Sequence, residues 1–515
     1  MNRRDFILTS ATLALQKGYS SALGRVLQAD AAIPETTLRD KLMLDRLRPQ
    51  YHLLPQAGFI GDPCAPRFFK GENHAFYHSG FGGRGWHHSI SPDLVHWKHM
   101  PIALTPTINS FDSYGTFTGS VLPGTDVASI IYTGVTKVPT EQETIRNEGL
   151  REVQCIATST DADLRTFHKV DRPVIETPPP GMKVTGFRDP FSWKDGDTWY
   201  IGVGSGFSRV GGAVLLYRSK DARNWEYLHP LAQGTWNGAQ SSNPVPSGEM
   251  WECPDFFPLG EKHVLIYSSE HTTFWEVGTY DKRELRFHPE RKGLLDHGAY
   301  YAPKSMLDDK MRRILWGWVQ ETRSQEAIDA AGWAGCMSLP RVLTLGNDGE
   351  LQMEVASEFT SIRTNTVTIQ QPHDSSELSD ALSRAIVHER AGEIMCTFKV
   401  GESSCGLDLQ LSSQGDVVSL LTVVYDGVND QPVLNISGKV VPLRPDIDGL
   451  SHVHIWIDGS VIETFIDKSQ AITTRCYATT SGTSEINVSW TGAVDSLKSL
   501  VISDIKPISD DRLTT

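Results

Sequence analysis

Short runs of apolar and aromatic residues, each bounded by glycine, aspartate or proline, recur along the first 350 residues of the chain. The runs are HAFYHS (74–79), ASIIYTG (128–134), TWYIGVGS (198–205) and HVLIYSS (263–269). They are too short for helices, are rich in β-branched and aromatic side chains, and end at turn-forming residues. The pattern therefore predicts β-strands throughout this part of the chain.

A second pattern follows these runs at a regular interval. Ser-x-Asp followed by an aromatic residue starts at Ser91 and Ser219, with weaker copies at Ser159 and Thr279. The starts are separated by 68, 60 and 60 residues. A four-stranded unit repeated at this interval is typical of a β-propeller, and roughly 300 residues would make about five blades. The Ser-x-Asp pattern itself is expected to be a turn followed by a packing residue.

The pattern changes in the last third of the chain. Residues 346–380 are polar and irregular and are predicted to be a linker region with an isolated strand or two. Within 381–515, alternation in segments such as CGLDLQLS (405–412) and HVHIWID (452–458) predicts antiparallel strands and a β-sandwich. The predicted fold class is therefore all-β, with a five-bladed β-propeller over residues 47–345 followed by a C-terminal β-sandwich.

Composition narrows the partners. The net charge of −14 argues against nucleic acid or an anionic membrane surface, and no apolar stretch is long enough to predict a membrane span. The seven cysteines are scattered, without a CxxC pair, and do not form a disulfide framework. The 13 tryptophans are compatible with carbohydrate binding and equally with core packing.

The first residues have the pattern of an export signal. Arg3 and Arg4 are followed by Phe6-Ile7-Leu8 and a short, mildly apolar stretch. This pattern predicts a twin-arginine signal peptide over residues 1–31 and a periplasmic or extracellular protein. An ordinary N-terminal helix is the alternative.

Three acidic residues hold nearly the same place in three of the repeats. Asp62 lies 29 residues before the first Ser-x-Asp pattern, Asp189 lies 30 before the third, and Glu252 lies 27 before the fourth. Equivalent positions in a propeller are related by rotation about its axis, so on the innermost strands these side chains would face one another. Asp62 and Asp189 each precede a proline, which favours extended backbone at the aspartate.

Carboxylates gathered at one axis repel each other, so their pKa values are expected to split. Arg188, beside Asp189, would keep one acid ionised, and Glu252, between Trp251 and Cys253, fits the protonated partner. An ionised carboxylate facing a protonated one can hydrolyse a glycosidic bond. A gap of about 5 Å favours retention of configuration and a wider gap favours inversion, and the sequence leaves both open.

Seven segments carry a resemblance to a known family: YHLLPQAGFIGDPCAP, SISPDLVHWKHMPIAL, GFRDPFSW, WECPDFFPL, LDHGAYYAPKSM, RRILWGWVQE and GWAGCMSLPRVLTL. In this order they resemble glycoside hydrolase family 32, which contains invertases, fructan hydrolases and fructosyltransferases. The likeness covers about residues 47–345 and continues more weakly over 452–466. It implies a five-bladed propeller, a fructoside substrate, retention at fructose C2, and neither a metal nor another cofactor.

The resemblance also implies roles for the motif residues. Asp62 would be the nucleophile on C2, and Glu252 would be the acid and base. Asp189 would bind fructose hydroxyls and stabilise the transition state. Arg188 would hydrogen-bond both sugar and carboxylates, and Cys253 would tune the acid.

Further residues are predicted to line the substrate pocket. Thr118 and Ser120 fall near the carboxylates' position in the repeat, where an ordinary strand pair is the alternative. Trp86, Tyr301 and Trp333 match aromatic positions of the family's pocket, with core packing as the alternative.

The chain departs from the family pattern around Asp62. Gly61 and Cys64 stand where the family usually has asparagine, and His78, a predicted substrate contact, stands where glutamine is common. Some fructosyltransferase-like members share the wording Gly-Asp-Pro-Cys-Ala, so transfer to a sugar acceptor is an alternative to hydrolysis. An inverting enzyme of the five-bladed arabinanase type and a fructan-binding propeller without catalysis are further alternatives.

The densest group of histidines predicts no metal site. These residues lack the ligand spacing of zinc sites. The group consists of His87, His88, His96 and His99.

Overall fold

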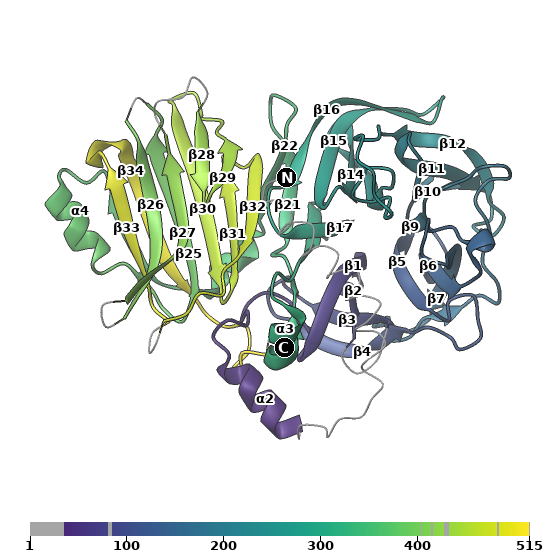
Figure 1. Cartoon of the computed structure of the whole chain (residues 1–515), viewed down its shortest axis with the longest axis horizontal. Coiled ribbons are helices and arrows are strands. Elements are labelled where there is room, and N and C mark those ends of the chain that lie inside the picture. Colours follow the sequence, from purple (N-terminus) through teal and green to yellow (C-terminus); the bar gives the residue numbers. More distant parts are fainter. Residues whose placement is uncertain are drawn as a thin grey trace.

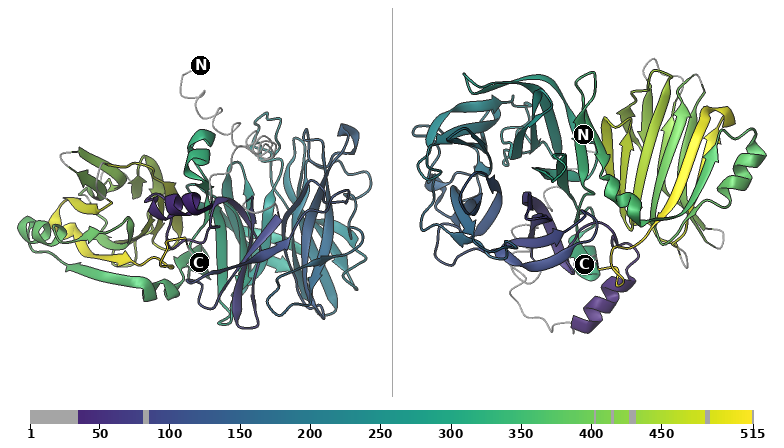
Figure 2. Two further views of the ribbon diagram at one scale, coloured as in Figure 1. Left: turned by 90° about the horizontal axis from the view of Figure 1, so that it is seen from below. Right: turned by 180° about the vertical axis from the view of Figure 1, so that it is seen from behind.

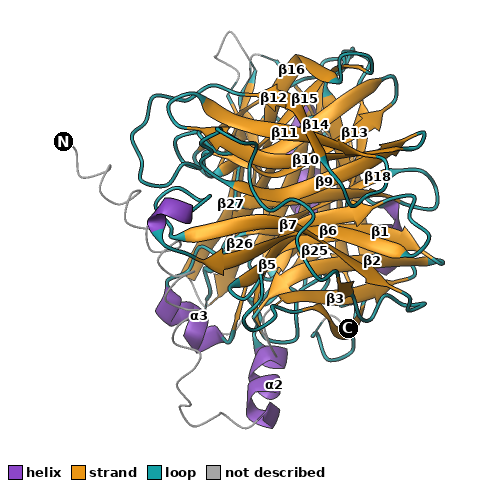
Figure 3. Cartoon of the chain, turned by 90° about the vertical axis from the view of Figure 1, so that its right-hand side faces the viewer, coloured by secondary structure: helices purple, strands orange, loops and turns teal. Residues whose placement is uncertain are grey.

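The protein folds into two β-rich domains that lie side by side, with the propeller on the right of Figure 1 and the sandwich on the left. The computed structural model describes residues 35–80, 85–401, 403–413, 416–426, 432–480 and 484–513. Figure 3 shows that strands make up nearly all of the regular structure. These features confirm the predicted fold class. The predicted export signal, residues 1–31, lies outside the described residues.

Five sheets, counted within the described residues, are arranged around a common centre and form the propeller blades. From inner to outer strand the blades are β1 (Gly58–Phe69), β2 (Glu72–Ser79), β3 (Gly85–Ser91) and β4 (Lys98–Leu104); β5 (Gly115–Leu122), β6 (Ala128–Lys137), β7 (Leu150–Ser159) and β8 (His168–Lys169); β9 (Phe187–Asp195), β10 (Thr198–Phe207), β11 (Gly211–Ser219) and β12 (Glu226–Gln233); β13 (Glu252–Leu259), β14 (Lys262–Ser269), β15 (Thr272–Asp281) and β16 (Arg286–Asp296); and β17 (Tyr300–Leu307), β18 (Arg313–Val319), β21 (Arg341–Leu345) and β22 (Leu351–Val355).

The innermost strands form a closed ring. Strand β1 contacts β5 and β17, β9 contacts β5 and β13, and β13 contacts β17. The short strand β19 (Trp333–Ala334) pairs in parallel with β1, joining Gly58 to Trp333, while β20 (Cys336–Met337) pairs with β18. Because β19 follows the fifth blade's second strand and pairs with the first blade, it ties the two ends of the ring together.

Every innermost strand carries a bulge close to the predicted site. The pairing register shifts after Gly202 opposite β9, after Glu252 in β13 and after Tyr301 in β17. Asp189, Cys253 and Ala302 there have φ values of 62°, 47° and 53°, and each precedes a proline. Proline has no N–H to lose from the ladder, and a bulge turns a side chain away from its regular direction. The extended backbone predicted at Asp189 is therefore wrong.

The repeated Ser-x-Asp pattern forms the turn between the third and fourth strands of a blade. Asp93 accepts hydrogen bonds from the backbone N–H groups of Val95 and His96. Asp221 and Asp281 make the same pair of bonds in their own blades. The aromatic residue that follows in the first blade, Trp97, is buried. The pattern thus has the structural role that the sequence predicts.

The C-terminal domain is a sandwich of two sheets, each with six described strands. In sheet order these are β23 (Arg363–Gln370), β34 (Leu497–Ile505), β25 (Ala391–Lys399), β30 (Leu450–Asp458), β31 (Val461–Ile466) and β32 (Gln470–Arg475), facing β24 (Ile386–Val387), β33 (Ile486–Gly492), β26 (Cys405–Ser413), β27 (Asp416–Tyr425), β28 (Val433–Ile436) and β29 (Lys439–Pro442). Figure 2 shows this domain beside the propeller from two further sides.

The structure differs from the linker predicted over residues 346–380. Strand β22 within this range is the outermost strand of the fifth blade, and β23 is an edge strand of the sandwich. Both are polar on one face because they lie at sheet edges, which is why their sequence appears irregular. The remaining short elements described are α2 (Glu35–Leu44), α3 (Gln325–Ala331), α4 (Ser375–Leu382), η1 (Thr140–Gln142), η2 (Ser357–Ile362) and η3 (Val494–Ser496). No helix in the described part of the chain has the length and hydrophobicity needed to span a bilayer.

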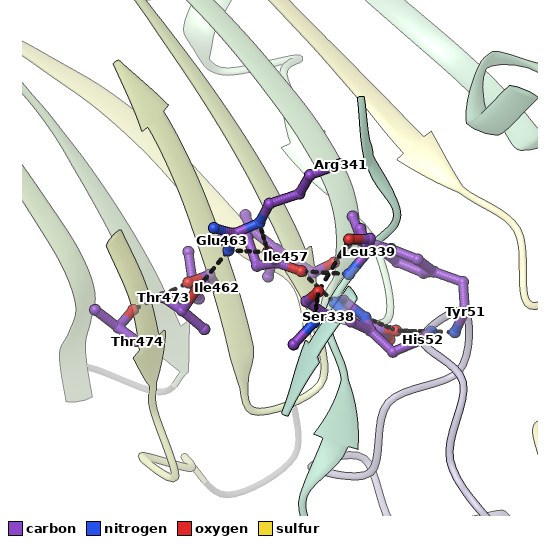
Figure 4. A network of polar contacts seen from close by, with 12 residues as sticks. Tyr51, His52, Ser338, Leu339, Arg341, Ile457, Ile462, Glu463, Thr473 and Thr474 are labelled. Carbon is purple, nitrogen blue, oxygen red and sulfur yellow. Dashed lines mark hydrogen bonds and ion pairs between the residues drawn. The ribbon is translucent and has the colours of Figure 1, made fainter. Parts of the chain in front are cut away.

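A buried ionic network joins the two domains, as Figure 4 shows. Arg341, from the fifth blade, donates to Glu463 of the sandwich at 2.6 Å and to Asp296 of the fourth blade at 2.8 Å. His52 lies between Asp458 at 2.8 Å and Glu463 at 3.0 Å. All five side chains have no exposed surface. Burial lowers the pKa of His52, but its two carboxylate partners outweigh burial and raise it.

Candidate active site

The innermost strands β1, β9 and β13 bring the three predicted carboxylates together around Cys253. The Cys253 Sγ lies 3.8 Å from Asp62 Oδ2 and 3.5 Å from Asp189 Oδ2. The Cys253 backbone N–H also donates to Asp189 Oδ2 at 2.9 Å. Because Glu252 is the residue before Cys253, one peptide unit connects all three acids. The structure thus places the three acidic residues together, as the repeat pattern predicts.

Both carboxylate oxygens of Glu252 accept hydrogen bonds. Arg188 Nη2 donates to Oε1 at 2.7 Å, and the Tyr301 hydroxyl donates to Oε2 at 2.5 Å. Arg188 comes from β9 and Tyr301 from β17, so the inner strands on either side of β13 fix the orientation of Glu252. The Glu252 side chain keeps 22% of its surface exposed, which leaves it accessible to a substrate.

Asp62 is partly buried and accepts a hydrogen bond from the Thr118 hydroxyl at 3.1 Å. Burial, followed by the negative charges of Asp189 and Glu252, raises the pKa of Asp62 to about 7. The bonds from Thr118 and Cys253 act in the opposite direction. Burial also raises the pKa of Asp189, although the nearby Arg188 opposes this. The three acids together therefore retain a proton close to neutral pH.

Which acid of the cluster carries the shared proton is not decided by these contacts, so the protonated partner predicted at Glu252 stays a prediction. Burial first, and then the neighbouring acids, raise the pKa values of Asp62 and Asp189. Glu252 is more exposed and faces the Arg188 guanidinium. Acids this close titrate as a coupled set, so the shared proton belongs to the cluster rather than to one residue.

The contacts that the structure describes for two predicted pocket residues do not include the carboxylates of the cluster. The Ser120 side chain is partly exposed, and its hydroxyl donates to Val121 O at 3.4 Å. His78 lies on β2, with its ring centroid 6.5 Å from that of Phe117. Burial, and then the charge of His87, lowers the pKa of His78 to about 4, so its ring is neutral at physiological pH.

Trp86 and Trp333 do not line the site, which corrects their predicted role. Trp86 has no exposed surface and packs in the core of the first two blades, where its Nε1 donates to Phe117 O at 3.3 Å. Trp333 is 1% exposed and donates to Asp45 Oδ2 at 2.7 Å. Both indoles belong to packing clusters, the alternative that the sequence left open.

Three further residues support the cluster and were not identified from the sequence. Glu152 accepts a hydrogen bond from Arg188 Nη1 at 3.0 Å, and Thr133 accepts one from the Asp189 backbone N–H at 2.9 Å. Lys304, 1% exposed, donates to Pro254 O at 2.7 Å. Thr133 lies on the second strand of the second blade and Glu152 on the third, away from the repeat position of the acids.

The structure describes every cysteine and every residue of the histidine cluster. All seven cysteines are free. Within the described residues, no group of three or more His, Cys, Asp or Glu side chains is placed to hold a metal ion. His88 instead bonds His74 at 2.9 Å, and His96 bonds Asp93 at 2.8 Å within the turn.

Replacing Thr118 by valine should change the pH dependence of catalysis. The Thr118 hydroxyl stabilises ionised Asp62, so its loss should let the cluster keep its last proton to a higher pH. We expect the fall of kcat/KM on the alkaline side, near pH 7 in the parent protein, to move upward by about half a unit. Initial rates from pH 4 to 9 would measure it. An unchanged or downward-shifted limb would contradict the assignment, and Thr125→Val, in a turn outside the cluster, serves as the control.

The class of protein that this fold and site indicate is the glycoside hydrolases, because acidic residues meet on the inner strands of a propeller that lies beside a β-sandwich. Two family descriptions match the chain: "Glycosyl hydrolases family 32 N-terminal domain" over residues 52–354 and "Glycosyl hydrolases family 32 C terminal" over residues 358–504. The chain belongs to glycoside hydrolase family 32 and is a β-fructofuranosidase-like hydrolase of fructofuranosides.

Several relatives support this membership. Sucrose-6-phosphate hydrolase of Escherichia coli is 32% identical over 461 residues, which cover 82% of this chain and 88% of that protein. Beta-fructofuranosidase, insoluble isoenzyme 4, of Oryza sativa subsp. japonica is 35% identical over 374 residues, covering 65% of this chain and 60% of that protein. The structure of a Bombyx mori family 32 beta-fructofuranosidase aligns with a TM-score of 0.72 at 26% identity, covering 92% of this chain and 97% of that one.

Proposed function

We propose that the protein hydrolyses unphosphorylated β-D-fructofuranosides, sucrose or fructans such as inulin and levan, with retention of configuration at C2. The observation that carries the proposal is the meeting of Asp62, Asp189 and Glu252 around Cys253 on three inner strands. Membership of a family of fructofuranoside hydrolases supports it.

In the first step, Asp62 attacks C2 of the fructosyl unit while Glu252 gives its proton to the glycosidic oxygen. The C2–O bond breaks, the alcohol leaves, and a covalent fructosyl–Asp62 ester forms. Asp189 accepts hydrogen bonds from the sugar hydroxyls, and its negative charge stabilises the positive charge that develops at C2. Arg188 donates hydrogen bonds to the sugar hydroxyls. When Oε2 of Glu252 is protonated, the direction of its hydrogen bond with Tyr301 reverses, and Glu252 donates to the Tyr301 hydroxyl. The glycosidic oxygen then takes this proton.

In the second step, ionised Glu252 removes a proton from water, and the water oxygen attacks C2. The ester bond to Asp62 breaks, fructose leaves, and the cluster returns with its one proton on Glu252. Two inversions at C2 give net retention. A sugar hydroxyl in place of water gives fructosyl transfer by the same steps.

The charge of the cluster favours an unphosphorylated substrate. Arg188 is bonded to two carboxylates, and Lys304 to a backbone carbonyl. Both cations are thus engaged, and the acids outnumber them, so the site presents little positive charge to a phosphate group. Sucrose 6-phosphate is therefore expected to be the poorer substrate.

Two measurements test the proposal. Proton NMR of sucrose cleavage should show the β-anomer of fructofuranose first, and the α-anomer first would contradict retention. Chromatography after incubation with concentrated sucrose, inulin, levan or sucrose 6-phosphate should show glucose and fructose in equal amounts from sucrose. Fructosylated oligosaccharides with glucose in excess would instead establish transfer, and faster cleavage of the phosphorylated sugar would overturn the substrate assignment.

We also propose export through the twin-arginine pathway. The support is the motif with Arg3 and Arg4, together with seven cysteines that remain as free thiols in the folded protein. In a bacterial host with this pathway, replacing both arginines by lysine should keep the activity in the cytoplasm. Fractionation with an activity assay measures the distribution, and equal periplasmic activity from both forms would contradict the proposal.

A further inference from the structure

A buried glutamate stands behind the active site without reaching its surface. Glu152 lies on β7, the third strand of the second blade, and its side chain has no exposed area. A charge in this position costs free energy unless it is fully paired. The partners of Glu152 must therefore offset the cost of burying its carboxylate.

Every partner of the Glu152 carboxylate is a donor. Arg188 Nη1 donates to Oε1 at 3.0 Å, and the Phe187 backbone N–H donates to Oε2. The Thr144 hydroxyl accepts from the Glu152 backbone N–H and donates to Oε2 at 3.3 Å. Burial raises the pKa of Glu152, but Arg188 and the Phe187 N–H oppose this. Because only the ionised carboxylate satisfies all of these bonds, Glu152 is assigned a negative charge, which Arg188 connects to the catalytic cluster.

The Arg188 guanidinium bridges this charge and the catalytic acids. Nη1 bonds Glu152, Nη2 bonds Glu252, and Nε lies 3.8 Å from Asp189 Oδ2. Burial alone lowers the pKa of Arg188, but the carboxylates raise it well above its usual value, and the charge of Glu152 is the first of these opposing causes. The fixed geometry of a guanidinium means that holding one nitrogen also aims the other.

We infer that Glu152 is a positioning residue for fructoside cleavage: it holds Arg188 so that Nη2 faces Glu252, and its charge offsets part of the positive charge that Arg188 presents to the cluster. This inference rests on the proposed roles of Glu252 and Asp189. Glu152 itself does not reach the substrate, because its side chain has no exposed surface.

The charge of Glu152 has a consequence that a structural role lacks. In Glu152→Gln, Arg188 is offset by one carboxylate fewer, so the cluster should release its last proton at a lower pH. The amide N–H₂ group also faces a donor, which turns Arg188 away from its present orientation. We expect kcat/KM on sucrose to fall by about 10- to 100-fold, and its alkaline limb to move to lower pH.

Two companion variants separate charge from position. Glu152→Asp keeps the charge but shortens the side chain, so kcat/KM should fall while the alkaline limb stays in place. Glu393→Gln removes a carboxylate of the sandwich that is 1% exposed and is paired with Arg363 and His454. This control should lower the melting temperature and leave the pH profile unchanged.

The pH profiles of the three purified variants, with melting temperatures, decide the question. The inference is overturned if the alkaline limb of the kcat/KM profile of folded Glu152→Gln does not move. It is also overturned if Glu152→Asp keeps the kcat/KM of the parent protein. If Glu152→Gln does not fold, Glu152→Asp alone decides by its kcat/KM. Failure of the proposed catalytic roles would appear elsewhere, as retained activity in variants of Asp62 and Glu252.

Discussion

Replacing Asp62 by asparagine is expected to lower kcat/KM on sucrose by about 10⁴-fold or more, because the variant lacks the carboxylate that forms the covalent ester. The same change should not destabilise the fold. The pKa of Asp62 is raised from its ordinary value of 3.8 to about 7, so the folded protein binds more protons than the unfolded chain in this window. The side chain therefore makes stability fall as pH rises from about 4 to 7, and asparagine removes that cost.

Glu252→Gln provides the comparison that identifies the roles. On a fructoside with a nitrophenolate leaving group, departure needs no proton, so the first step in Glu252→Gln should remain fast. Asp62→Asn should be inactive on both substrates. Burst and steady-state kinetics on the two substrates, with Asp221→Asn in an exposed turn as the control, make the measurement. Near-full activity of Asp62→Asn would contradict the proposed mechanism.

Replacing Arg341 by methionine is expected to lower the free energy of unfolding by about 3–5 kcal/mol. The variant leaves the carboxylates of Asp296 and Glu463 buried, with 0% exposed side chains, and without their cation. Methionine keeps much of the packing against the Tyr300 ring, which lies 4.1 Å from the guanidinium carbon. The loss should therefore come from unpaired charge rather than from a cavity.

Urea unfolding at pH 7 measures the effect of Arg341→Met. The matched control is Lys282→Met, because Lys282 pairs with Asp195 on the surface, with 67% and 51% of the side chains exposed. Such pairs contribute about 0–1 kcal/mol. Equal losses in the two variants would mean that the buried network does not hold the domains together.

The sequence predicts those site residues that occupy the same position in successive repeats. Asp62, Asp189 and Glu252 share a repeat position, and rotation about the axis converts a shared position into proximity. Glu152 and Thr133 reach the cluster from the third and second strands of the second blade, where no periodicity indicates which side chains face the neighbouring blade.

The errors of the sequence analysis also have physical causes. An aromatic residue in a strand can face the channel or the gap between blades, and both Trp86 and Trp333 face packing clusters. The bulge at Asp189 places its backbone at φ 62°, although the following proline favours extended geometry, because surrounding contacts override a local preference.

The shared interior at the domain boundary makes the protein a poor source of separable modules. Tyr300, Trp316 and Leu339 of the propeller and Trp456 and Phe465 of the sandwich belong to one apolar cluster. A propeller excised at the boundary would expose that surface and leave Arg341 without its partner Glu463. The catalytic half therefore depends on its companion for solubility, and grafting this propeller onto another scaffold would require redesigning the face that the sandwich covers.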